Sequence, residues 1–136
     1  FRYQRKVSGP IADRIDRWME VGQIEHEILG EAKSGPRTDE TAFRVAGARN
    51  LQKERFKQKN ILTNSELGVR EIEEFAPLSP DARNALNQAA KHLDLSPRAY
   101  HRVIKIGRTI SDLERDVEIK QGHILEALQY RPKSNF

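Results

Sequence analysis

The chain has 136 residues, of which 37% are hydrophobic and 32% charged, as expected for one strongly helical domain with a modest core. Cysteine is absent, which excludes disulfides and thiolate metal sites, and no apolar run is long enough for a membrane span or a signal peptide. The net charge of +4 comes from 24 Lys+Arg against 20 Asp+Glu, a balance too mixed to indicate nucleic-acid binding by itself.

Residues 1–22 are predicted to form a turn, a short helix and a strand. Pro10 can occupy the first position of a helix, and from Ile15 onward the apolar residues alternate as in a strand. The chain has no initiator Met, so we interpret this stretch as the end of a larger domain rather than the beginning of one. Residues 23–37 contain two glycines, a proline and scattered charges, and are predicted to be a connector.

Residues 38–136 are predicted to form a compact bundle of about five helices, so the fold class is all-α. The first helix is capped by Thr38 or Asp39 and runs to about Lys59, and a short helix follows at about 69–75. Each of the next two helices begins with a serine followed by proline, a strong start signal. These starts are Ser79-Pro80 and Ser96-Pro97, and a last helix covers about 120–130.

The helix that begins at Ser96 has the clearest apolar stripe of the chain and is predicted to be the central one. Its stripe consists of Tyr100, Val103, Ile104, Gly107, Ile110 and Leu113.

Four basic residues on the same helix are predicted to share the side opposite this stripe: Arg98, Arg102, Lys105 and Arg108. They are open to two interpretations, a solvated basic face with Asp112 as a partner, or a surface for anions or nucleic acid. Arg98 lies in the first turn, where the helix dipole disfavours a cation, and phosphate recognition would explain its presence.

Other catalytic and metal-binding patterns are missing from the sequence. It has no GxxxxGK[ST] loop for nucleotide phosphates, no plausible Ser/His/Asp set and no paired carboxylates. The four histidines lie far apart with no HxH or HxxxH pair, so no metal site is predicted. The chain alone is therefore not expected to be an enzyme, and Arg14, which lies between two aspartates, is open to interpretation as a surface ion pair.

Three segments in collinear order carry a resemblance to a known family. Residues 3–16 read YQRKVSGPIADRID, residues 95–113 read LSPRAYHRVIKIGRTISDL, and residues 123–131 read HILEALQYR. Together they resemble the bacterial magnesium-chelatase-like AAA+ ATPases of the ComM/YifB family, whose first segment follows the pattern R-Y-x-x-K-[IV]-S-G-P-[IL]-x-D-R-I-D. Arg17-Trp18 departs from the family, which usually has a small or apolar run at that place.

This resemblance implies that residues 1–22 end the αβα ATPase core and that residues 38–136 are the C-terminal helical lid. Arg14 matches the arginine finger, which reaches the γ-phosphate of ATP in a neighbouring subunit. Arg98 matches the sensor-2 arginine, which contacts nucleotide phosphates either in its own subunit or in a neighbour. The Walker A and Walker B elements are then expected upstream of Phe1.

Relatives of this kind are implied to be cytoplasmic homo-hexameric motors that use ATP and Mg²⁺ and act on DNA, with branch-migration helicases among them. Two other functions stay open at the level of the sequence. One is a free-standing helical DNA-binding module that uses the basic residues from Arg98 to Arg108. The other is the lid of a true magnesium-chelatase ATPase subunit, with no role on nucleic acid.

Overall fold

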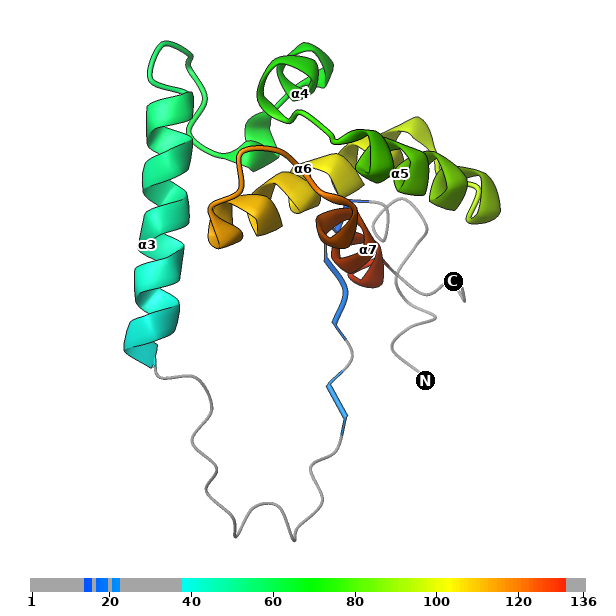
Figure 1. Cartoon of the computed structure of the whole chain (residues 1–136), viewed down its shortest axis with the longest axis horizontal. Coiled ribbons are helices and arrows are strands. Elements are labelled where there is room, and N and C mark those ends of the chain that lie inside the picture. Colours follow the sequence, from blue (N-terminus) through cyan, green and yellow to red (C-terminus); the bar gives the residue numbers. More distant parts are fainter. Residues whose placement is uncertain (1–13, 16, 20, 23–37, 132–136) are drawn as a thin grey trace, which may run out of the picture.

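The computed structural model describes residues 14, 15, 17–19, 21, 22 and 38–131, and in that part of the chain the secondary structure is helical (Figure 1). This confirms the predicted all-α bundle. The α-helices are α3 (Thr38–Arg55), α4 (Val69–Phe75), α5 (Pro80–His92), α6 (Pro97–Glu114) and α7 (Gln121–Gln129), and a single 3-10 turn, η2 (Asn64–Glu66), precedes α4.

Helices α5 and α6 begin where the serine–proline pairs predict. The hydroxyl oxygen of Ser79 accepts a hydrogen bond of 3.2 Å from the amide of Ala82, and that of Ser96 accepts one of 3.2 Å from the amide of Ala99. A proline occupies the first turn of both helices. Each cap satisfies an amide that would otherwise lack a partner within the helix, so both boundaries follow directly from the sequence.

Helix α6 is the central element, as predicted, and packs against α3, α4, η2 and α7 (Figure 1). Gly107 allows the closest approach to the α7 side of the bundle, because a Cβ there would lie 3.2 Å from side-chain atoms of both Ile119 and Ile124. The buried apolar core combines side chains from these elements and from α5. Its members are Phe56, Leu67, Ile72, Ala76, Ala82, Leu86, Val103, Ile104, Ile110, Ile119, Ile124 and Ala127.

Helix α3 stands at the edge of the bundle and joins it near its C-terminal end (Figure 1). It is shorter than predicted, because the helix ends at Arg55 and not near Lys59. Only Ala48 and Gln52 of this helix are buried, whereas Phe43 is 67% exposed. Val45 and Leu51 are also exposed, so the large apolar side chains of α3 lie mostly in solvent.

Residues 15–22 differ from the predicted strand. The described residues of this stretch carry no strand assignment, and the backbone amide of Trp18 donates a 2.8 Å hydrogen bond to the carbonyl of Tyr130, just after α7. A strand needs a neighbouring strand to pair with, and the end of a helix cannot provide one. The start of the predicted short helix, at Pro10, and the connector at 23–37 fall outside the described residues.

Candidate functional site

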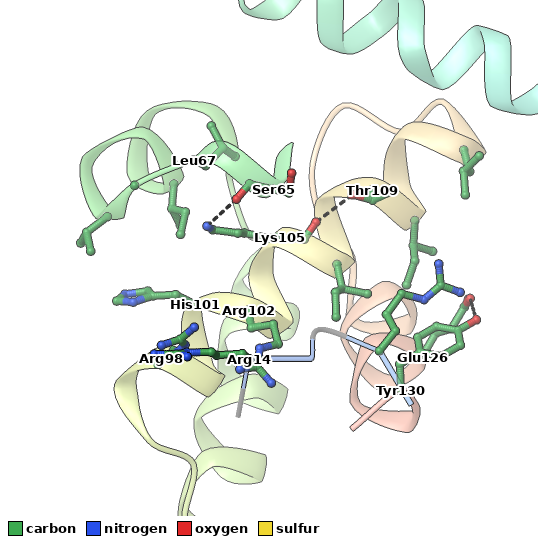
Figure 2. Close-up of a pocket in the computed structure, with 17 residues that line it drawn as sticks. Arg14, Ser65, Leu67, Arg98, His101, Arg102, Lys105, Thr109, Glu126 and Tyr130 are labelled. Atoms are coloured by element: carbon green, nitrogen blue, oxygen red, sulfur yellow. Dashed lines mark hydrogen bonds between the residues drawn. The ribbon is translucent and has the colours of Figure 1, made fainter. Parts of the chain in front are cut away.

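A cavity of about 710 Å³ lies between α6 and the elements around it (Figure 2). Helix α6 forms one wall, and the other walls come from η2, α4, α7 and two arginines near the start of the described chain. The apolar part of the lining consists of Leu67, Val69, Ile72, Ile106, Ile110 and Leu113. A cavity of this size, apolar with a few convergent polar groups, is typical of a small-molecule site.

Among the described residues, five cationic side chains line the cavity, together with a single carboxylate, that of Glu126. Three belong to α6 and two to the described residues near the N-terminus, so residues that are distant along the chain converge here. Figure 2 shows Arg14, Arg98 and Arg102 gathered on one side of the cavity and Glu126 and Tyr130 on another. The cationic residues are Arg14, Arg17, Arg98, Arg102 and Lys105.

Two of these cations also hold the walls of the cavity. Nη1 of Arg102 donates a 3.1 Å hydrogen bond to the carbonyl of Ile15. Nζ of Lys105 donates a 2.9 Å hydrogen bond to the carbonyl of Ser65 in η2 (Figure 2). Charged donors make stronger hydrogen bonds than neutral ones, so α6 anchors both neighbouring segments. The sequence-predicted residues Arg102 and Lys105 thus have a structural task at the site.

Arg108 was predicted to share the basic face, and this prediction is wrong. Its side chain is 1% exposed, and at about 100° per residue it lies roughly 120° around the helix from Arg102. Its guanidinium donates to Asp112 at 3.1 Å and to the carbonyls of Val117 and Asp116 at 2.7 and 2.6 Å. Burial lowers the pKa of Arg108, and the carboxylate of Asp112 opposes that shift. Thr109 takes the place on the cavity wall instead.

Asp112 joins Arg108 to helix α3. Asp112 was expected to be a partner of a solvated basic face, but it pairs instead with the buried Arg108, away from solvent. The carboxylate is fully buried and also accepts hydrogen bonds from the Arg55 guanidinium and, at 2.8 Å, from the side-chain amide of Asn64. Two arginines and an amide thus surround one carboxylate, which satisfies all of these buried polar groups. The network fixes α3 and η2 against α6, behind the wall of the cavity.

Arg17 and Tyr130 line the cavity without having been predicted as site residues. The guanidinium carbon of Arg17 lies 4.6 Å from the centre of the Tyr130 ring, a cation–π contact. The Tyr130 hydroxyl donates a 3.1 Å hydrogen bond to Glu126 one turn earlier (Figure 2). Tyr130 lies in a segment that carries the family resemblance, whereas Arg17 lies just beyond one, at the place where this sequence departs from the family. No sequence periodicity relates two positions so far apart, so their contact could not be predicted.

A second cluster, made of residues outside the cavity lining, brings His123 together with two carboxylates. Nε2 of His123 lies 2.9 Å from Glu114 and 3.3 Å from Asp116, although the histidine spacing predicted no metal site. Nδ1 of the same ring accepts a 3.0 Å hydrogen bond from the amide of Lys120. The neutral ring therefore carries its proton on Nε2 and donates it to the carboxylates, whereas a metal would require that nitrogen deprotonated.

Lys120 and Asp116 form an ion pair beside this cluster, with Nζ of the lysine 2.7 Å from the carboxylate. The hydrogen bond from Lys120 lowers the pKa of Asp116, and the same bond raises the pKa of Lys120. The hydrogen bond between the Lys120 amide and the His123 ring caps the first turn of α7, so the polar atoms of this cluster are used within the structure.

The comparison with protein families settles what kind of chain this is. The family described as "Magnesium chelatase, subunit ChlI C-terminal" matches residues 35–131, which cover all the described helices. The chain belongs to this magnesium-chelatase C-terminal family. Its central helix and cavity lie wholly within the matched residues, apart from Arg14 and Arg17.

Curated relatives of this magnesium-chelatase-like chain extend the match toward the N-terminus. It is 36% identical over 131 residues to the Competence protein ComM of Haemophilus influenzae, and 35% identical over 131 residues to the YifB proteins of Salmonella typhimurium and Escherichia coli. Each alignment covers 96% of this chain and 25% of the relative. The chain thus spans about a quarter of the length of these relatives, which confirms the resemblance to the ComM/YifB proteins.

Among the residues whose structure is described, no helix combines the length and apolar character that crossing a bilayer requires.

The cavity beside α6 is cationic and partly apolar, which suits an anionic ligand with an organic part.

Proposed function

We propose that this chain is the C-terminal part of a magnesium-chelatase-like AAA+ ATPase, in which Arg14 is the arginine finger and Arg98 the sensor-2 arginine. The observation that carries this proposal is that both arginines line one cavity, although they lie far apart in sequence. Arg102 supports the arrangement, since it lies one turn after Arg98 on α6 and donates a hydrogen bond to the carbonyl of Ile15, next to Arg14.

The chemistry of phosphate recognition fits this pair. A guanidinium presents a fork of N–H donors that matches two phosphate oxygens, and it stays charged at every physiological pH. During phosphoryl transfer negative charge spreads over the transferred group, and cations already held in place stabilise it. Arg14 and Arg98 would supply two such cations, and Mg²⁺ would come with the ATP.

The shared cavity supports contact of both arginines with the same phosphate chain. A finger acts across a subunit interface, so Arg98 would then serve the neighbour's nucleotide together with Arg14. Hydrolysis at that interface would change the contacts of α6 and turn the helical domain, which is one way a ring-shaped motor converts chemistry into movement.

The relatives indicate the biological setting of the proposal. One of them is named a competence protein, and we propose for this chain a cytoplasmic homo-hexameric ring that acts on DNA as a helicase or branch-migration motor. The lid of a true chelatase subunit is the alternative with the same ATP chemistry. No residue of the described helices distinguishes a motor that acts on DNA from a chelatase subunit.

A test of the anion site uses the 136-residue chain and sodium tripolyphosphate, followed by isothermal titration calorimetry. We expect binding to the unmodified chain, and binding weakened roughly 10- to 100-fold by Arg14→Ala or Arg98→Ala, since each change removes a charge-assisted contact. Arg49→Ala is the matched control, because Arg49 is an exposed arginine of α3 outside the cavity lining. An equal loss of affinity in all three variants would mean that binding depends only on the overall charge of the chain, and would contradict a specific anion site in the cavity.

The free-standing DNA-binding module makes a different prediction for the same chain. The structure weakens it, since Arg108 is buried and does not extend the basic stripe. Any binding to duplex DNA should then be weak and should fall steeply as salt is raised, as for non-specific phosphate contacts. Sub-micromolar binding at physiological salt would support the module instead.

A further inference from the structure

Three contacts between described residues attach the stretch that carries Arg14 to the helical bundle. We call this stretch the arginine segment (Arg14, Ile15, Arg17, Trp18 and Met19). The Ile15 carbonyl accepts a hydrogen bond from the bundle at 3.1 Å, the Trp18 amide donates one to it at 2.8 Å, and Arg17 lies 4.6 Å from an aromatic ring centre. Figure 1 shows the segment passing beside α7.

Two of these three contacts are made by Tyr130. Its carbonyl accepts from the Trp18 amide, and its ring receives the Arg17 guanidinium. The ring is half-buried against the core, and its hydroxyl is held by Glu126, so it presents a fixed surface to the segment. A guanidinium over such a partly desolvated ring is attracted by the ring quadrupole.

We propose that Arg17 and Tyr130 are a positioning pair that holds Arg14 at the cavity beside Arg98. The inference rests on the proposed function, because it concerns the same anion site, but the attachment itself can be measured without any ligand. Arg17 and Tyr130 act through Arg14 and need not touch the phosphate. Arg14 thereby moves with α6 and α7, and the two arginines reach an anion as one unit.

The physical basis is the entropy of ordering. Arg14 is three residues from the cation–π contact and one from the Ile15 carbonyl bond. With the segment attached, little conformational freedom remains to be lost when an anion binds, which is the advantage of preorganisation. Without the attachment, the same loss would have to be met at each binding event.

Trp18 provides the first measurement, since it is the only tryptophan of the chain and its indole nitrogen is buried. In Tyr130→Ala we expect a red-shifted emission and a larger acrylamide quenching constant for Trp18, with helical circular dichroism unchanged. Tyr130→Phe keeps the ring and should behave like the unmodified chain. Unchanged quenching in Tyr130→Ala would overturn the proposal.

Arg17→Gln covers the case in which Tyr130→Ala disturbs folding. It removes the cation from an exposed position and leaves α7 and the core untouched. We expect the same direction of change in Trp18 quenching as for Tyr130→Ala. A quenching constant equal to that of the unmodified chain would contradict the role of the cation–π contact.

The second measurement links the pair to Arg14 through tripolyphosphate binding. Tyr130→Ala should weaken binding about 3- to 30-fold, the equivalent of one cation–π contact. In an Arg14→Ala background the same change should have little effect, because there is no longer an Arg14 to position. A full Tyr130→Ala loss in that background would contradict positioning and indicate direct contact.

The two failures can be told apart. If the unmodified chain does not bind tripolyphosphate but Trp18 quenching responds as expected, the proposed anion site fails and the attachment stands. If the chain binds tripolyphosphate and Trp18 does not respond in either variant, the anion site stands and the positioning pair fails.

Discussion

Asp112 is the residue on which the buried polar network of this bundle depends. Its fully buried carboxylate lies between Arg55 of α3 and Arg108 of α6 and also accepts from Asn64. Buried charges are tolerated only with partners, and removing one partner leaves the others uncompensated. Two arginines share this single carboxylate, so it has no substitute among its neighbours.

The corresponding prediction concerns stability. Asp112→Ala should lower the free energy of unfolding by about 3–5 kcal/mol, because it leaves a buried guanidinium without its counter-charge. Urea denaturation followed by circular dichroism would measure it. Glu118→Ala, at an exposed position in the turn after α6, should change stability by less than about 0.5 kcal/mol. A loss below about 1 kcal/mol for Asp112→Ala would contradict this account of the network.

The sequence predicts the helices better than their surroundings. The starts of α5 and α6 follow from local chemistry, a serine oxygen and a proline, and need nothing from the rest of the fold. The burial of Arg108 could not be predicted in the same way, because it depends on Arg55 and Asp112 being brought to one place. Arg14 was predicted from the resemblance alone, and Arg98 from its place in the first turn of α6 as well as from the resemblance. That both line one cavity depends on the packing of distant segments and could not be predicted from either residue.

At the scale of elements, the crossing of α6 with α7 depends on Gly107. A side chain there would press on Ile119 and Ile124, which are both fully buried. Gly122, in the first turn of α7, has no atom within 4 Å of the place a Cβ would take. The two glycines thus differ in packing alone, since neither has a positive φ.

We expect Gly107→Val to destabilise the chain by about 1–3 kcal/mol through overpacking. Gly122→Ala should stabilise it by about 0.5–1 kcal/mol, because alanine loses less entropy in a helix. Urea unfolding of the two variants and the unmodified chain at one temperature would measure both changes in the free energy of unfolding. Equal stability of Gly107→Val and the unmodified chain would mean that α7 can shift away from α6 without loss.

At the scale of the whole molecule, this chain is a quarter of its curated relatives in length, and the proposed hydrolysis belongs to the longer protein. The bundle brings two arginines to a site but contains no GxxxxGK[ST] loop. In the proposed ring, an arginine finger of one subunit would act on the γ-phosphate of ATP bound by its neighbour, which would make turnover depend on assembly.

Steady-state phosphate release tests this division. The 136-residue chain should show no ATPase activity. In the longer protein, Arg14→Ala should lower kcat by roughly 10³- to 10⁵-fold, as for other arginine fingers, with nucleotide binding largely kept. Arg49→Ala should leave kcat unchanged. ATP hydrolysis by the 136-residue chain alone would contradict the proposed division of roles. Unchanged activity of Arg14→Ala in the longer protein would contradict the assignment of Arg14 as the arginine finger.

The attachment of the arginine segment has a consequence for how its sequence can vary. At Ile15 the bundle binds the main-chain oxygen, and at Trp18 it binds the main-chain amide. Every amino acid has that oxygen, so a substitution at position 15 does not remove this hydrogen bond. Position 18 tolerates every residue except proline in this respect, since proline alone has no amide hydrogen. These two main-chain hydrogen bonds thus survive most substitutions at positions 15 and 18, and the attachment depends on three particular side chains, those of Arg102, Arg17 and Tyr130.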